Sequence, residues 1–165
     1  MALRNIRIDG DPLLRKRSKE IETIDTRLKI LLDDMLETMY DAEGVGLAAP
    51  QVGILRRAVV VDIGDGPMKL INPVIKNSSG ESFMAEGCLS IPDYSGVVCR
   101  PEKLSLEYLD IDGNKKYLEA EGFLARAICH EVDHLEGILF KDKVIPEEQL
   151  PKEYLEQERK RERRA

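Results

Sequence analysis

The chain has 165 residues, a length that favours a single domain. Its 25 Lys and Arg residues against 31 Asp and Glu residues give a net charge of −6, which argues against nucleic-acid binding as the main activity, because that activity needs a basic surface. Apolar residues make up 42% of the chain and charged residues 34%, so the composition is that of a folded domain and excludes disorder for most of the chain.

No segment is typical of a membrane span or a targeting sequence. The longest strictly apolar run, Ala58 to Val61, is far shorter than the roughly 20 residues that cross a bilayer. The first residues contain no apolar block of signal-peptide length. Three cysteines, an odd number, do not suggest a disulfide framework. We therefore expect a cytoplasmic protein with no membrane contact and with cysteines in the reduced state.

A helix is predicted from Asp25 to Asp41. Its apolar residues recur at spacings of three and four, at Leu28, Leu31, Leu32, Met35, Leu36 and Met39. Asp25 is a suitable N-cap, and Gly44 is expected to stop the helix.

Residues 44–53 are rich in glycine, almost uncharged and predicted to form a loop. Within them, Gly-x-Gly-x-x-Ala resembles a phosphate-binding turn, but that turn must follow a strand and open a helix. This loop instead follows a helix and leads into strands. We interpret its two glycines as a place where the backbone approaches a ligand closely, with the Gln51 amide directed into the site.

Several short strands are predicted next, over residues 57–62, 69–71, 95–100, 103–110 and 115–121. Asn72-Pro73 is expected to end the second of them. A turn at Asp112-Gly113-Asn114 predicts that the last two pair as a hairpin. A second helix is predicted over Phe123 to Glu136 and ends at Gly137. The order of helix, strands and helix favours an α+β fold.

The last residues differ in composition from the rest. We predict a single catalytic domain over residues 1–145 and a charged, helical tail over residues 146–165. The tail begins acidic and ends in a basic cluster formed by Arg159, Lys160, Arg161, Arg163 and Arg164. Two interpretations are open: a solvated helix whose charges suit its dipole, or a docking handle for an anionic partner.

Residues 130–134, His-Glu-Val-Asp-His, lie within the second predicted helix. Residues four apart share one helix face, so His130 and His134 can hold one metal ion. Glu131 is then placed to handle a proton from bound water. The chain has two histidines and both are here, which argues against a chance spacing.

A third metal ligand is required, and the sequence offers several. In one class of zinc peptidases it is a His a few residues downstream, where this chain has Phe140. Another class uses a downstream Glu, but Glu153 and Glu156 lie in the charged tail, a poor place for a dry site. Cys88, between uncharged neighbours, is the better candidate, because a thiolate with two neutral imidazoles suits zinc or ferrous iron.

The other two cysteines are interpreted as packing residues. Cys129 adjoins His130 but points about 100° round the helix from it. Cys99 lies within a predicted strand. Composition alone does not choose Cys88 over Cys99 as the ligand.

Three segments, 44–51 (Gly-Val-Gly-Leu-Ala-Ala-Pro-Gln), 86–90 (Glu-Gly-Cys-Leu-Ser) and 130–134, resemble the three motifs of the peptide deformylase family in the family's order. The similarity extends from Gly10-Asp11-Pro12 to the end of the second helix, and every motif position matches. It implies an α+β fold in which antiparallel strands pack around a central metal-binding helix, with one helix N-terminal and one C-terminal to them. It also implies a hydrolase that removes the formyl group from the N-terminal formylmethionine of new polypeptides.

The resemblance also implies roles for single residues. The metal ligands would be Cys88, His130 and His134, with ferrous iron as the usual metal and zinc, nickel or cobalt as substitutes. Metal-bound water would attack the formyl carbon, with Glu131 as general base and then general acid. The remaining implied roles are an oxyanion hole formed by Gln51 and the Leu89 N–H, a substrate hydrogen bond from Gly46, and a methionine pocket lined by Phe123 and Arg126.

Around the ligands, Glu86 and Asp133 are candidates to accept imidazole N–H groups, and Arg100 could pair with either carboxylate. Two other functions were weighed. A zinc endopeptidase would need a downstream ligand, and a structural metal module would need a fourth protein ligand. The expected partners are formylated nascent peptides and, through the basic end of the tail, the ribosome, with no DNA.

Overall fold

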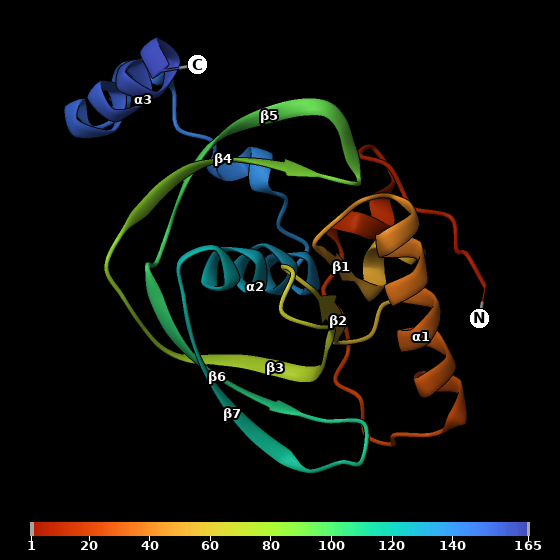
Figure 1. Cartoon of the computed structure of the whole chain (residues 1–165). Coiled ribbons are helices and arrows are strands. Elements are labelled where there is room, and N and C mark those ends of the chain that lie inside the picture. The colour runs from red at the N-terminus through yellow and green to blue at the C-terminus, as the bar shows by residue number, and fades with distance from the viewer. Residues whose placement is uncertain (1, 165) are drawn as a thin grey trace.

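The computed structural model describes residues 2–164, so Met1 and Ala165, the outer ends of the predicted domain and tail, lie outside it. The described chain is an α+β structure with two antiparallel sheets (Figure 1), as the sequence predicts. Its helices are α1 (Thr26–Asp41), α2 (Gly122–Leu135) and α3 (Lys152–Arg164). Its strands are β1 (Gly46–Ala48), β2 (Ala58–Val61), β3 (Met68–Ser79), β4 (Ser82–Cys88), β5 (Ile91–Arg100), β6 (Lys103–Leu109) and β7 (Lys115–Glu121).

The five-stranded sheet has the order β1-β2-β3-β6-β7, and β4 pairs with β5 alone. Helix α2 lies in the middle of the molecule, with the β4–β5 pair above it and the larger sheet below it in Figure 1. Its buried apolar residues pack with β2, β6 and β7 in one core cluster, while α1 packs on a second cluster around β1 and β2. The arrangement places the outward face of α2 opposite β4 and β5.

Helix α1 confirms the predicted periodicity and cap. The Asp25 side chain accepts a hydrogen bond from the Leu28 N–H at 2.9 Å, which satisfies one of the free donors of the first turn. Leu28, Leu32, Met35 and Met39 are fully buried on one face. Burial of this apolar face, rather than helix propensity, fixes the helix on the sheet.

Some of the strand predictions were wrong. β3 does not end at Asn72-Pro73 but continues to Ser79, with a shift in its pairing to β6 between Ile71 and Val74. Asn72 adopts a φ of +49°, and its side-chain amide both donates to and accepts from the backbone of Ile21. These contacts support a bulge that accommodates a proline without an N–H, so the strand passes through it.

The predictions also missed β4 entirely and assigned β1 to a loop. β4 carries Glu86 and Cys88, and its partner β5 begins at Ile91, earlier than predicted. The segment Ser-Phe-Met-Ala-Glu-Gly-Cys has few β-branched residues, so local propensity gives little signal there. Pairing with β5 determines its conformation. Within the described residues, no helix combines the length and apolar character needed to cross a membrane.

Gly137 ends α2 and offers a test of the packing between this helix and the N-terminal region. It has a φ of +74°, and a Cβ placed on it would lie 2.4 Å from the Arg15 carbonyl oxygen. We expect Gly137→Ala to lower the free energy of unfolding by about 2 kcal/mol or more, because backbone strain adds to a steric clash. Urea denaturation measures this.

Gly113→Ala is the matched control. Gly113 also has a positive φ, +82°, but its added Cβ would meet nothing closer than 3.8 Å. Gly113→Ala should lower the free energy of unfolding by about 1 kcal/mol, from backbone strain alone. Equal losses in the two variants would show that the contact with Arg15 is unimportant.

Candidate active site

A cavity of about 470 Å³ opens between α2, β4 and the segment that precedes β1. Cys88, His130 and Glu131 all lie on its wall. These residues come from two motifs that are more than 40 positions apart in the sequence, as the Cys88–His134 separation of 46 shows. The fold thus brings chemically active side chains together at one opening.

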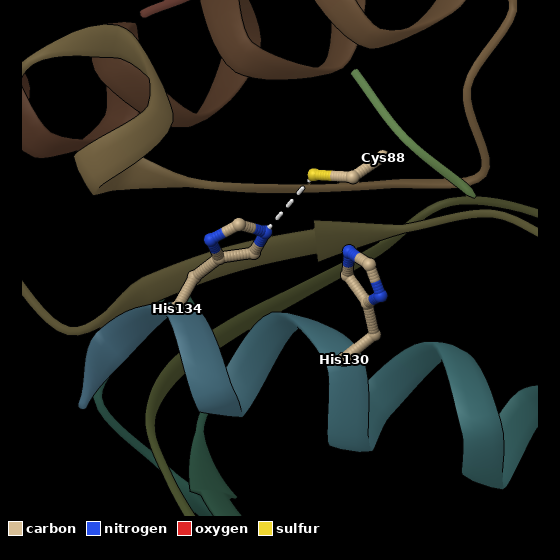
Figure 2. Close-up of side chains that lie close together, drawn as sticks. All are labelled: Cys88, His130 and His134. Atoms are coloured by element: carbon tan, nitrogen blue, oxygen red, sulfur yellow. Dashed lines mark hydrogen bonds between the residues drawn. The ribbon is translucent and has the colours of Figure 1, made fainter. Parts of the chain in front are cut away.

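Cys88, His130 and His134 converge there. One potential ligand atom from each residue lies within 4.8 Å of the other two. The rings of His130 and His134 rise from successive turns of α2, and the Cys88 sulfur points toward them from the end of β4 (Figure 2). The Cys88 Sγ lies 3.4 Å from the His134 Nε2. Cys129 instead packs in the core and Cys99 lies along β5.

The chemistry of these residues fits a divalent metal ion. A thiolate and two imidazoles are ligands that zinc and ferrous iron accept, and three protein ligands leave room for a further one. Burial lowers the pKa of His134 well below its usual value, which keeps that imidazole neutral and able to coordinate. Burial opposes protonation of His130 as well, but its neighbours Glu131, Cys88 and Glu86 raise its pKa to about 10. The site therefore favours a positive charge at its centre.

Glu86 orients one of the two rings. Its Oε1 lies 3.0 Å from the His130 Nδ1, which leaves the Nε2 of that ring for the cavity. Arg100 donates two hydrogen bonds to the same carboxylate at 2.9 and 3.0 Å, and Arg126 donates a third at 2.6 Å. Burial would raise the pKa of Glu86, but His130 and Arg100 hold it at about 2. Glu86 is thus an anion fixed against the His130 imidazole.

Asp133 and the arginines lie further out. Arg100 bridges Glu86 to Asp133 with a hydrogen bond of 2.7 Å, and Lys143 also pairs with Asp133. Both carboxylates named from the sequence therefore pair with Arg100. Of the two, Glu86 contacts the His130 ring. Asp133 reaches the site through Arg100.

Arg126 lies at the cavity wall, but its charged group faces inward. The side chain is almost fully buried, and its guanidinium also donates to the Val98 and Ser82 carbonyl oxygens. The sequence suggested a residue that lines the methionine pocket. The geometry shows that its charge holds Glu86 and the β4–β5 pair, a contact that the motif spacing did not reveal.

Phe140 packs on His130. Its ring is buried and stacks on the His130 ring, with centroids 5.8 Å apart and planes 28° from parallel. At the position where another class of metallohydrolase has a ligand, this chain therefore has a ring that supports His130. Glu153 and Glu156 are exposed on α3, and they are not among the side chains that converge with the two histidines.

Glu131 lies against Gly46. A Cβ on Gly46 would stand 2.5 Å from the Glu131 Oε2, so a side chain at position 46 would displace the carboxylate. Burial raises the pKa of Glu131 to about 7. Its Oε1 is buried with no hydrogen-bond partner among the described residues. A carboxyl group in this state is suited to accept and return a proton near neutral pH.

Gln51 is held in one orientation. Its Oε1 accepts a hydrogen bond from the Ala48 N–H at 2.9 Å, and its Nε2 donates to the Ser90 Oγ at 3.1 Å. The same Nε2 lies 3.6 Å from the Cys88 Sγ, and both Gln51 and Leu89 line the cavity. Ser90 is fully buried, and sequence reasoning gave it no role.

The cavity mouth is apolar. Phe123 and Met84 are each a little over two-fifths exposed on its wall, and Val45 lies on the opposite side with a similar exposure. Apolar side chains that remain open to solvent at a cavity mouth indicate a place for an apolar ligand group. Phe123 is thus where the sequence places it, while Met84 and Val45 were not identified.

Comparison with known proteins assigns this site to a family. The family model described as polypeptide deformylase matches residues 3–150. The chain belongs to the polypeptide deformylase family. Members of this family are metal-dependent hydrolases that remove the N-formyl group from nascent peptides, and this is the function of the chain.

Two relatives show how far the similarity extends. The peptide deformylase of Acetivibrio thermocellus is 59% identical over 145 residues, which cover 88% of this chain and 85% of the relative. That of Caldicellulosiruptor bescii is 56% identical over 161 residues, 98% of this chain and 96% of the relative. The similarity to the second relative therefore includes most of the tail.

Solved structures agree with the fold. The crystal structure of the Thermotoga maritima peptide deformylase has a TM-score of 0.86 and 43% sequence identity, covering 87% of this chain and 99% of that one. The Ehrlichia chaffeensis enzyme in complex with actinonin has a TM-score of 0.86 and 34% identity over the full length of both chains. The predicted α+β fold and deformylase family are confirmed.

Proposed function

We propose that Cys88, His130 and His134 hold the metal at which this enzyme hydrolyses the formyl amide. The convergence of their ligand atoms, with Cys88 and His130 on the cavity wall, supports this assignment. When bound, a divalent metal would act as a Lewis acid and activate a water molecule at neutral pH. Ferrous iron is the metal we propose for the cell, with zinc, nickel or cobalt able to replace it.

Glu131 is the proposed proton carrier. It lies beside the ligands on α2, and its raised pKa lets it take a proton from the attacking water and deliver it to the leaving amine nitrogen. Gly46 leaves space for the carboxylate. Because the group is buried, the proton is not lost to bulk solvent between the two steps.

Gln51 and the backbone N–H of Leu89 are proposed to stabilise the negative oxygen of the tetrahedral intermediate. The Gln51 amide is already fixed by Ala48 and Ser90, so it needs no reorganisation during the reaction. One such donor is worth roughly 3 kcal/mol in a site shielded from water.

The rest of the cavity is proposed to hold the first residue of the substrate. The Gly46 backbone would hydrogen-bond the peptide, and Phe123 would contact the methionine side chain, with Met84 beside it. Arg126 would shape this pocket from behind, through Glu86, without presenting its charge to the apolar side chain. A formyl group is small, so a narrow site admits it and excludes larger acyl groups.

Loss of a ligand should be distinguishable from loss of the proton carrier. We expect Cys88→Ala to lose most bound metal and activity, because two ligands remain. Glu131→Ala should keep its metal while turnover of formyl-Met-Ala-Ser falls by about 10²-fold or more. Elemental analysis of the purified variants, beside the hydrolysis assay, measures both quantities.

Cys129→Ala is the control, since Cys129 is a core residue next to His130 and should keep both metal and activity. Equal metal loss in the two cysteine variants would remove the assignment of Cys88. Wild-type turnover in Glu131→Ala would show that another group carries the proton.

The identity of the metal can be tested by exposure to air. Cys88 lies on the wall of an open cavity, where a thiolate next to ferrous iron is a target for oxidation. We expect the iron-loaded enzyme to lose activity in air within the period over which the nickel-loaded and cobalt-loaded enzymes keep theirs. Identical decay with all three metals would contradict this expectation.

We further propose that residues 1–145 are the catalytic unit of a cytoplasmic enzyme and that the tail docks on the ribosome, where the substrate emerges. The basic residues of α3 are exposed, and this helix lies at the edge of the molecule in Figure 1, away from α1. The body of the protein is acidic, so a local basic surface is needed to approach anionic RNA.

Charge removal on α3 tests the docking. Arg163→Gln with Arg164→Gln should weaken co-sedimentation with ribosomes at low salt and reduce its dependence on salt, because fewer counterions are released. Turnover of a short formylated peptide should not change. Substitution is preferable to deletion of the tail, because Tyr154 of α3 packs on Phe83 of β4.

The matched control is Arg27→Gln with Lys29→Gln, which removes two exposed positive charges from α1. It should leave co-sedimentation unchanged. If the α3 variant binds ribosomes as the wild type does, α3 is a solvated helix, and the assignment of the active site is unaffected.

A further inference from the structure

Residues 2–9 form an extended segment outside any helix or strand, here called the strap (red in Figure 1). Its backbone bonds to two places that the sequence does not connect. The Arg7 N–H donates to the Gln51 carbonyl oxygen at 2.6 Å, and the Asp9 N–H donates to the Ser90 carbonyl oxygen at 2.8 Å. The strap thus joins the short helical turn Ala49–Val52 to the turn between β4 and β5.

The two carbonyl groups belong to the segments that carry the proposed oxyanion donors. Gln51 supplies its side-chain Nε2, and Ser90 follows Leu89, whose N–H is the other donor. The side chains of Gln51 and Ser90 are also bonded to each other at 3.1 Å. The strap links the two segments through their backbone carbonyl groups, and the contact between Gln51 and Ser90 links them through their side chains.

The other end of the strap is anchored on α1. The Ala2 N–H and the Arg4 guanidinium bond to the Asp34 carboxylate at 2.8 to 3.0 Å, and the Arg4 N–H donates to the Thr38 Oγ1 at 2.9 Å. Asp34 is almost fully buried, so loss of these partners would leave an unpaired buried charge, which is strongly unfavourable. The Asp34 carboxylate of α1 thus anchors the strap, which otherwise has little buried surface.

The strap also covers the turn that carries Gln51. A Cβ on Gly53, two residues after Gln51, would stand 2.8 Å from the Arg7 guanidinium. Arg7 therefore contacts this turn through both its backbone and its side chain. The Asp9 side chain in turn pairs with Lys141, which follows the Phe140 that stacks on His130.

We propose that the strap is a positioning element of the oxyanion hole: by bonding both Gln51 and Ser90, it sets the spacing of the Gln51 amide and the Leu89 N–H. The inference rests on the proposed roles of those two donors. Errors of position of about 1 Å at such groups can cost about 10²-fold in rate, so a support of this kind has kinetic consequences. The strap touches neither the metal ligands nor the proposed substrate pocket.

The experiment compares the loss of one N–H of the strap with the loss of the same residue's side chain alone. Asp9→Pro lacks the N–H that bonds to Ser90, whereas Asp9→Ala keeps it and loses only the pairing with Lys141. In the metal-loaded enzyme we expect Asp9→Pro to lower kcat on formyl-Met-Ala-Ser about tenfold, with KM within about twofold of the wild-type value. Asp9→Ala should remain within about twofold of wild type in both constants.

A double-mutant cycle separates positioning from general destabilisation. If the strap acts through the oxyanion hole, Asp9→Pro should cost less than about twofold in kcat when Gln51 is already Ala, because the positioned amide is gone. A destabilised protein would instead lose the same factor in both backgrounds. Full additivity, or equal kcat for Asp9→Pro and Asp9→Ala, would overturn the proposal.

A second pair of variants acts from the other end of the strap and does not depend on how proline is tolerated. Asp34→Ala removes the anchor on α1, and we expect about a threefold loss of kcat that again disappears in the Gln51→Ala background. Asp33→Ala, a neighbouring exposed aspartate of the same helix, is its control and should not change kcat. A kcat unchanged in Asp34→Ala would count against the strap, whereas a kcat unchanged in Gln51→Ala alone would overturn the oxyanion assignment on which it rests.

Discussion

The buried carboxylate of Glu86 is the interaction on which the rest of the site depends. It accepts hydrogen bonds from Arg100 and Arg126 and faces the Nδ1 of His130, so it joins β4, β5 and α2 at one point. A buried charge that loses its partners costs several kcal/mol. The β4–β5 pair therefore settles on α2 in the one arrangement that satisfies Glu86, and the same arrangement brings the Cys88 sulfur to the histidines. Packing and ligand geometry are consequences of a single ion cluster.

The pair of histidines on α2 and the whole of α1 could be predicted from local sequence patterns. The 130–134 spacing places two imidazoles on one helix face whatever surrounds the helix, and the period of α1 and its Asp25 cap are properties of a short stretch of chain. The choice of Cys88 over Cys99 could not be made in this way, because it depends on which strand end meets α2. The uncharged neighbours of Cys88 and the resemblance to a known family both favour it, but neither shows the contact between the end of β4 and α2.

The interactions that sequence reasoning missed are those between distant segments. Ser90 holds Gln51 and Arg126 turns inward to Glu86 across separations of 39 and 40 positions, and Phe140 stacks on His130 from beyond the end of α2. No periodicity encodes such contacts. The wrong prediction that the strand ends at Asn72-Pro73 has the same origin. The Asn72 side chain bonds to the backbone of Ile21, and this contact lets β3 continue through a dipeptide that usually ends a strand. Hydrogen bonds between distant segments thus override the local conformational preference of the chain.

Charge balance explains why so polar a site can be buried. The two arginines, with Lys143 at the edge, compensate Glu86 and Asp133, whereas the buried Glu131 Oε1 has no hydrogen-bond partner among the described residues. In the protein alone, Glu131 responds with a pKa raised to about 7, which means that it retains its proton over part of the neutral range. A divalent cation at the converging ligands would supply the missing charge and favour the ionised carboxylate. Burial thus keeps the pKa of Glu131 near the neutral range, where the carboxylate can accept a proton.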